Sequence, residues 1–454
     1  MNKHLSQSEN LFAGAMNAFS IMPAKMLGEV RKADTSGVSI SVGKTIDQAY
    51  DNPEKIQEIY NLLDRLGGEF EVHHKVARHV AQKRLWQYLF PETQSQKHRR
   101  LKIIDRHLEP HRARLLYDSH EGGPWHQQRG SATALLTISI AHDLNAPHSS
   151  GIYKMMSGPL DETIVDYTFD DRCESLSGLS LSEAIVKTEM EFNHRSRDNA
   201  ASYADHKLAK LQQFVHAKPN DRFKQVVQYC TDSLGIRSRG QEVSAAIEDH
   251  IINESRAHSE CKEPLIMSFG CGTALPILTT MKNLKESHRV NTRVILLDQD
   301  PIALAAAAQL ADKMGLSGSI EMYCYKLFRT LGQPVDMKPI LKGRKLDVYE
   351  DSGLREYLPD HVYTALTFSA WRSLARNGLM TTGNMNTHRP QAEFVGGLMG
   401  WIPHVQKRTI KQGIRLHKRA RVPLSAIRVR VTQDGVYTLY FSSRKFIGTY
   451  DAEK

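Results

Sequence analysis

Glycines and one acidic residue stand where a ligand that contains a nucleoside could be held. Residues 264–304 contain an apolar strand, Leu265–Phe269, a turn of small residues, a helix-like segment and a second apolar strand ending in Asp298. Glycines at a strand-to-helix turn let the backbone approach a ligand closely, and the helix that follows presents free N–H groups there. An acidic residue that ends the next strand can accept hydrogen bonds from two ribose hydroxyls. The spacing therefore predicts a site for a nucleoside-containing cofactor.

The turn departs from the fingerprint of dinucleotide-binding proteins. Gly270 and Gly272 are present, but Ala274 replaces the third glycine and Pro276 follows closely. That fingerprint serves a pyrophosphate on the helix N-terminus, and no arginine stands beside Asp298 to meet a 2′-phosphate. The pattern favours a nucleoside cofactor without a pyrophosphate over NAD. Taken alone, the turn is also typical of a tight strand-to-helix connection that binds no ligand.

Two segments, 268–274 (SFGCGTA) and 296–304 (LLDQDPIAL), resemble motif I and the acidic loop of class I S-adenosylmethionine-dependent methyltransferases. The resemblance implies S-adenosyl-L-methionine as cofactor, with Gly270 and Gly272 beneath its methionine part and Asp298 on its ribose. Asp300 is the alternative ribose acceptor. The implied cofactor-binding residues are Phe269, Gly270, Cys271, Gly272, Thr273, Asp298, Gln299, Asp300 and Ser352.

A second block, residues 347–360 and 377–384, is similar to bacterial methyltransferases related to the enzymes that make 3-hydroxy fatty acid methyl esters as quorum signals. Those carry a Gly-Leu-x-Asp-Tyr-Leu run and a Gly-Asn after the fifth strand. Here Arg355 and Glu356 alter the run, and Asn377 replaces the usual proline. The resemblance covers about 264–401 and implies the fold and the cofactor more firmly than the substrate.

Methyl transfer from a sulfonium is an in-line displacement, so alignment supplies much of the catalysis. A carboxylate acceptor needs no general base, whereas an amine or a hydroxyl does. The catalytic candidates at the strand ends are Glu350, Asp351, Tyr357 and Asn384, with Asn386 and His388 nearby. The alternatives are a turn cap for the two acids and a core aromatic for Tyr357. Cys271 has no local histidine partner, which favours small-residue packing over a nucleophile.

The elements that position these residues follow from periodicity. Apolar spacing predicts helices over about 45–120 and one long helix over 181–216, and from about residue 222 helices and strands alternate. The expected strands are Leu265–Phe269, Val294–Asp298, Ser319–Cys324, Leu346–Tyr349, Gly378–Thr382 and a hairpin of Ile427–Thr432 with Val436–Phe441. Such alternation predicts an α/β fold. We expect a Rossmann-like doubly wound sheet, mostly parallel with a C-terminal antiparallel hairpin, in a domain 221–454. A mostly helical N-terminal domain, 1–220, precedes it.

Composition limits the remaining choices. The chain has 454 residues, and its five cysteines form no CxxC pair, which fits a reducing compartment; we expect a cytoplasmic protein. The 21 histidines lie largely among lysines and arginines, so no metal is expected, and no apolar run is long enough for a transmembrane segment.

The net charge of +10 is concentrated near the C-terminus, because residues 394–433 contain no Asp or Glu. This window carries Lys407, Arg408, Lys411, Arg415, Lys418, Arg419, Arg421, Arg428 and Arg430. It could meet nucleic acid or an anionic surface, or form a solvated helix face. The favoured function is methylation of a small or lipid-like molecule at a carboxylate or hydroxyl oxygen. An RNA or protein methyltransferase and a non-catalytic cofactor-binding scaffold stay open.

Overall fold

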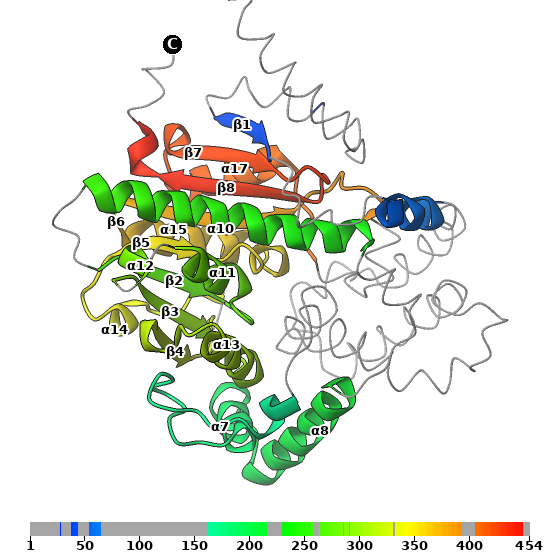
Figure 1. Cartoon of the computed structure of the whole chain (residues 1–454), viewed down its shortest axis with the longest axis vertical. Helices are drawn as coiled ribbons and strands as arrows, with labels where there is room; N and C mark the ends of the chain where they lie inside the picture. The colour runs from blue at the N-terminus through cyan, green and yellow to red at the C-terminus, as the bar shows by residue number, and fades with distance from the viewer. Residues whose placement is uncertain are drawn as a thin grey trace, which may run out of the picture.

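An eight-stranded mixed sheet forms the centre of the computed structural model (Figure 1). The structure describes residues 28, 38–43, 54–64, 162–215, 229–257, 263–284, 286–289, 291–329, 332–392 and 405–447. The strand order is β1-β7-β8-β6-β5-β2-β3-β4. The strands are β1 Ser39–Val42, β2 Leu265–Phe269, β3 Arg293–Asp298, β4 Ile320–Cys324, β5 Leu346–Glu350, β6 Leu374–Met385, β7 Ile427–Val431 and β8 Tyr437–Ser443.

All neighbouring strands pair in parallel except β8, which is antiparallel to both β6 and β7. The expectation of a mostly parallel sheet with a C-terminal antiparallel hairpin is therefore confirmed. The chain adds β3 and β4 on one side of β2 and then returns to place β5 on the other side. The carboxyl ends of β2 and β5 thus meet at a topological switch point, where open α/β sheets bind ligands.

Helices cover both faces of the sheet and bury its apolar side chains in two clusters. On one face lie α10 Thr231–Ala257, α11 Leu275–Asn283 and α13 Pro301–Lys313, whose apolar residues join a core with Val294, Leu296 and Val348. On the other face lie α14 Lys338–Leu341, α15 Asp360–Ser373 and α17 Ile410–Arg419, which pack on Met267, Ile295 and Tyr349. Alternate residues of each central strand point to opposite faces, so these strands are apolar on both sides.

The expected single helix over 181–216 is wrong. The structure has two helices, α7 Leu181–Asn193 and α8 Arg197–Val215, separated at His194, which has a left-handed φ of 55°. α7 starts with a capping box in which Ser180 and Glu183 satisfy each other's backbone N–H groups. The break lets α7 and α8 fold back and bury Ile185 and Leu211 in the same core as α13 (Figure 1).

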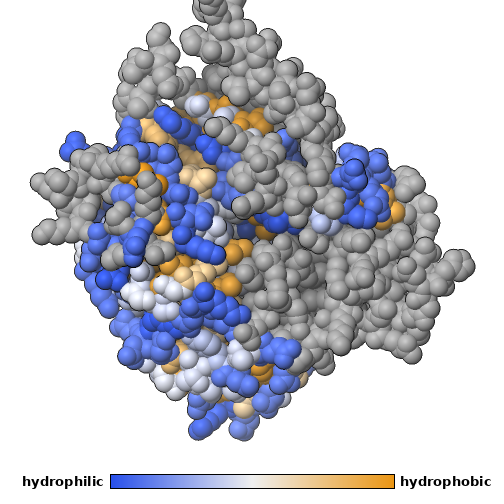
Figure 2. All heavy atoms as spheres, in the orientation of Figure 1, coloured by the Kyte–Doolittle hydropathy of each residue, from blue (hydrophilic) through white to orange (hydrophobic). Residues whose placement is uncertain are grey.

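The N-terminal region contributes a strand to the sheet. β1 pairs in parallel with β7, in register from Ser39 with Arg428 to Val42 with Val431. A short helix over 54–64 also agrees with the expected helical pattern, although most of residues 1–161 lie outside the described residues. The domains 1–220 and 221–454 stay predictions. No helix among the described residues is long and apolar enough to cross a membrane. Figure 2 shows mostly hydrophilic residues over the described part of one face, with smaller hydrophobic areas between them.

Candidate functional site

The glycine turn joins β2 to α11 through three residues with left-handed backbone. Gly270, Gly272 and Ala274 have φ values of 69°, 54° and 55°. The N–H groups of Gly270 and Cys271 both donate to the carbonyl of Leu297, which ties the turn to the end of β3. Glycine adopts such angles without strain, whereas alanine does not. The turn therefore forms where the sequence predicts it, and Ala274 holds a left-handed φ that is strained for alanine.

Asp298 ends β3 directly beside this turn. Its Oδ2 accepts the N–H of Gly272 at 2.8 Å, and its Oδ1 accepts the N–H of Asp300 at 3.0 Å. Burial raises the pKa of the Asp298 carboxyl group, against the lowering effect of these backbone hydrogen bonds. The carboxylate also accepts the backbone N–H of Gln299, so one of its about four acceptor positions is left for a hydroxyl. The turn and the carboxylate therefore form one unit that could hold a ribose.

A cavity of about 240 Å³ opens next to Asp298, between α7, α8 and the residues that follow β3 and β4. Gln299 and Asp300 line it from the sheet side, and Asp300 also caps α13 by accepting the N–H of Ile302 at 3.1 Å. The opposite wall includes Thr188, Phe192, Asn193, Tyr203 and Lys207. Aromatic side chains and amides around one cavity suit a planar heterocycle, so this is the candidate place for the base of a nucleoside.

Glu350 lies at the switch point, opposite Ser268 of β2 in the parallel register. Its Oε2 accepts the Ser268 hydroxyl at 2.5 Å, and its Oε1 accepts the N–H and the hydroxyl of Ser352 at 2.7 and 2.6 Å. The structure thus brings together Glu350 and Ser352, two of the predicted residues, next to the glycine turn. In this arrangement the Glu350 carboxylate also caps the turn after β5.

Asp351 is engaged in a separate buried network. Its carboxylate forms a bidentate ion pair with Arg355, with both Nε–O distances at 2.8 Å, and accepts the Tyr349 hydroxyl at 2.9 Å. Both charged side chains are fully buried. Arg355 also donates to the carbonyl of Tyr363 at 3.0 Å, which fixes α15 to the turn. These contacts favour a structural role for Asp351.

Asn384 is buried inside a similar network. Its amide donates to the carbonyls of Met385 and Gln406, and its Oδ1 accepts a hydrogen bond from Arg408 at 2.7 Å. Gly383 precedes it at a point where a Cβ would stand 2.5 Å from the carbonyl oxygen of Ser352, so only glycine fits there. The Gly383-Asn384 pair therefore packs β6 against the turn after β5.

The basic window is smaller than the sequence suggested. Arg408 is only 4% exposed and donates to the carbonyls of Arg355 and Leu358, so its inclusion in a surface patch is wrong. Arg430 pairs with the buried Glu242 at 2.5 Å. The exposed cations of the window are Lys411, Arg415, Lys418, Arg419, Arg421 and Arg428.

The remaining predicted residues are placed as follows. The Phe269 side chain is buried and packs edge-on against Phe328, so only its backbone faces the turn. Burial raises the pKa of the Cys271 thiol well above its usual range, which disfavours a thiolate nucleophile. Thr273 is buried, and Tyr357 is half-buried, with its pKa raised first by burial and then by the charge of Glu356.

Three residues near the crevice escaped the sequence analysis as site candidates. Arg239 of α10 donates from Nη1 to the Tyr437 hydroxyl at 2.9 Å, and that hydroxyl donates to Glu356 Oε1 at 2.9 Å. Glu356 could have been found from the sequence, because it takes the place of Asp in the Gly-Leu-x-Asp-Tyr-Leu run of the methyltransferases that this segment resembles. Arg239 and Tyr437 lie 198 positions apart, and nothing in their local sequence marks them.

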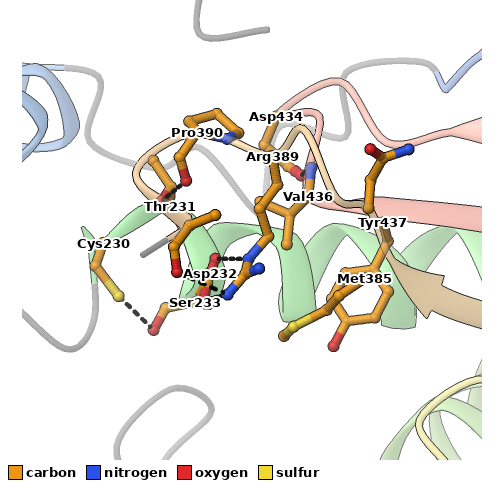
Figure 3. A network of polar contacts seen from close by, with 12 residues as sticks. Cys230, Thr231, Asp232, Ser233, Met385, Arg389, Pro390, Asp434, Val436 and Tyr437 are labelled. Atoms are coloured by element: carbon orange, nitrogen blue, oxygen red, sulfur yellow. Dashed lines mark hydrogen bonds and ion pairs between the residues drawn. The ribbon is translucent and has the colours of Figure 1, made fainter. Parts of the chain in front are cut away.

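The loop after β6 is fixed beside this cluster by a buried ion pair, shown in Figure 3. Arg389 of the loop donates to both carboxylate oxygens of Asp232 on α10, at 2.8 and 2.9 Å. Thr231 donates from the same helix end to the carbonyl of Pro390 at 3.5 Å. The loop at the carboxyl end of β6 is therefore held against α10, which also supplies Arg239.

The described residues contain no group of three or more His, Cys, Asp or Glu side chains that could hold a metal ion. No family model matches the chain. A comparison with curated proteins finds no match either.

Solved structures do match, with low identities and TM-scores. A possible exported protein from Bordetella parapertussis has a TM-score of 0.40 and 14% identity, over 58% of this chain and 94% of that one. An O-methyltransferase family protein from Burkholderia thailandensis has a TM-score of 0.33 and 14% identity, over 48% of this chain and 60% of that one. Magnesium protoporphyrin IX methyltransferase from Synechocystis, solved with S-adenosylmethionine bound, has a TM-score of 0.33 and 11% identity, over 47% of this chain and 83% of that one.

Proposed function

We propose that the protein is an S-adenosyl-L-methionine-dependent methyltransferase of class I that acts on an oxygen of a small or lipid-like molecule. The observation that carries the proposal is the hydrogen bond from the Gly272 N–H to the Asp298 carboxylate at the switch point of the sheet. This hydrogen bond joins the glycine turn to the proposed ribose acceptor, at the edge of the sheet where α/β folds bind ligands.

The residues present fit this cofactor. Gly270 and Gly272 carry no side chains at the turn, and Asp298 keeps acceptor capacity for a ribose hydroxyl. The cavity beside Gln299 and Asp300 lies on the same side, where the base would be held. We therefore assign these residues to cofactor binding.

When bound, the cofactor supplies an electrophilic methyl group on a positively charged sulfur. The protein's own part is to align the acceptor oxygen with that methyl group and to exclude water, which can contribute about 7–11 kcal/mol to catalysis. Of the predicted catalytic residues, Tyr357 in the turn after β5 remains a candidate for this task, whereas the two Glu350 oxygens already accept hydrogen bonds from Ser268 and Ser352. Asp351 and Asn384 would act through packing, because their polar atoms are engaged inside the fold.

The acceptor class is proposed from the basic window and from the resemblance in sequence. The RNA or protein alternative is weakened because Arg408 and Arg430 of the basic window are engaged with internal groups, which leaves six exposed cations there. A small or lipid-like substrate with a carboxylate or hydroxyl oxygen is the better proposal, and the resemblance to makers of hydroxy fatty acid esters agrees with it. A cytoplasmic location stays a prediction, with which the four free cysteines of the described residues agree.

Calorimetric titration with S-adenosylmethionine and S-adenosylhomocysteine tests the proposal. The wild type should bind both, and Asp298→Ala should bind about 10- to 100-fold more weakly, because hydrogen bonds to a charged group contribute about 1.5–3 kcal/mol. Asp336→Asn changes an exposed carboxylate that caps α14 and serves as the matched control with unchanged affinity. Absence of binding to the wild type overturns the proposal, and full affinity in Asp298→Ala overturns the ribose assignment.

A further inference from the structure

Arg239, Glu356 and Tyr437 form a polar cluster at the carboxyl edge of the sheet. Arg239 reaches from α10 over the turn after β5, where its Nη2 lies 3.0 Å from the position that a Cβ on Gly353 would take. Its guanidinium also lies 4.7 Å from the centre of the Tyr437 ring. The turn that holds Gly353 also holds Leu354, whose side chain packs over Gly270. The cluster therefore adjoins the glycine turn that we assign to the cofactor.

The cluster leaves hydrogen-bonding capacity unused. Glu356 is 2% exposed, and its Oε1 accepts the Tyr437 hydroxyl and lies 3.6 Å from Arg239 Nη1. Among the residues that the structure describes, the buried Oε2 of Glu356 and the buried Nε of Arg239 have no hydrogen-bond partner. Buried polar atoms are nearly always paired, so an unpaired acceptor on Glu356 and an unpaired donor on Arg239, two side chains in contact through Oε1 and Nη1, favour a ligand that supplies partners. A hydroxyl group can donate to the first and accept from the second.

The charges around Glu356 suit proton exchange near neutral pH. Burial raises the pKa of Glu356 to about 7, against the lowering effect of Arg239, the Tyr437 hydrogen bond and Arg389. The charged and titratable groups that act on Glu356 or on its partner Arg239 are Arg239 of α10, Tyr437 of β8, Arg389 of the loop after β6, the neighbouring Tyr357, and Glu350 of β5. A general base is most effective when its pKa is close to the working pH.

We propose that Glu356 is the general base of the methyl transfer, with Arg239 holding the acceptor oxygen, and that this acceptor is a hydroxyl group. The proposal rests on the proposed function. The hydroxyl proton passes to Glu356 Oε2 as the hydroxyl oxygen bonds to the methyl carbon, and the electrons of the broken carbon–sulfur bond remain on sulfur as a neutral thioether. A carboxylate acceptor would need no base and would be repelled by an ionised Glu356.

Proton release on cofactor binding tests this without a known substrate. The sulfonium charge of S-adenosylmethionine, which S-adenosylhomocysteine lacks, lowers the pKa of a carboxyl group that faces the reacting methyl group. Titrations at pH 7 in buffers of different ionisation enthalpy should therefore show release of up to about half a proton in the wild type, because Glu356 is about half protonated there. At pH 9, where Glu356 is already ionised, this release should disappear.

Glu356→Gln should lose the release at pH 7 while still binding both compounds. Glu321→Gln is the control. Glu321 pairs with Arg344, which lowers its pKa, so Glu321 is already ionised at pH 7 and this variant should release as many protons on cofactor binding as the wild type. Equal proton release in Glu356→Gln and the wild type overturns the proposal, as does transfer to a carboxylic acid at full rate by Glu356→Gln. Neither result affects the proposed function, which fails only if the wild type binds neither compound.

Discussion

Replacing Glu356 by Gln should stabilise the protein at pH 8 far more than at pH 5. Burial is the main cause that raises the Glu356 pKa from 4.5 to about 7. A group whose folded pKa is raised contributes stability that is fully present below pH 4.5 and is lost as the pH rises through about 7. Because one pKa unit corresponds to about 1.4 kcal/mol, the loss at pH 8 amounts to about 3 kcal/mol. Gln does not ionise, and its amide oxygen can still accept the Tyr437 hydroxyl.

Urea unfolding followed by circular dichroism at the two pH values measures this effect. The free energy of unfolding gained by Glu356→Gln should be about 2.5 kcal/mol larger at pH 8 than at pH 5, because at pH 5, just above the unfolded pKa, only about a quarter of the loss has occurred. Glu321→Gln should show the opposite sign, with a loss at pH 8 below about 1 kcal/mol, because that pair is half-exposed. A gain for Glu356→Gln that does not depend on pH would refute the reasoning.

Two further variants separate structural from catalytic roles at the site. Asp351→Ala should lower the free energy of unfolding by about 3–5 kcal/mol, because it leaves the buried donors of Arg355 and Tyr349 without their acceptor; normal stability with lost turnover would instead indicate catalysis. Ala274→Gly should raise the melting temperature with a gain of about 0.5–1 kcal/mol, because it relieves a left-handed φ of 55°. Ala303→Gly, inside α13, should lower it, and a loss in both variants would contradict the assignment of strain to Ala274.

The sheet and the cofactor turn could be predicted because their signals are local. An apolar run before Gly270 and another before Asp298 fix two strands and the turn between them, and β2 has the expected bounds. β6 runs beyond its expected end to Met385 because the antiparallel partner β8 continues to pair there, a contact that lies far away in sequence. The break at His194 was missed because polar residues surround it and no proline or glycine marks it.

The roles of the catalytic candidates could not be predicted in this way, because the contacts that decide them are not local in sequence. Proximity to a strand end selected Asp351 and Asn384, yet the partners that engage their polar atoms are Arg355 and Arg408, which a strand-end pattern does not reveal. Glu356 differs from these two residues. Its partner Arg239 belongs to α10, which comes before β2 in the sequence, and among the described residues Glu356 Oε2 and Arg239 Nε have no hydrogen-bond partner. Both oxygens of the Asp351 carboxylate are paired, whereas Glu356 keeps Oε2 available for a ligand. That difference, rather than position at a strand end, makes Glu356 the stronger candidate for chemistry.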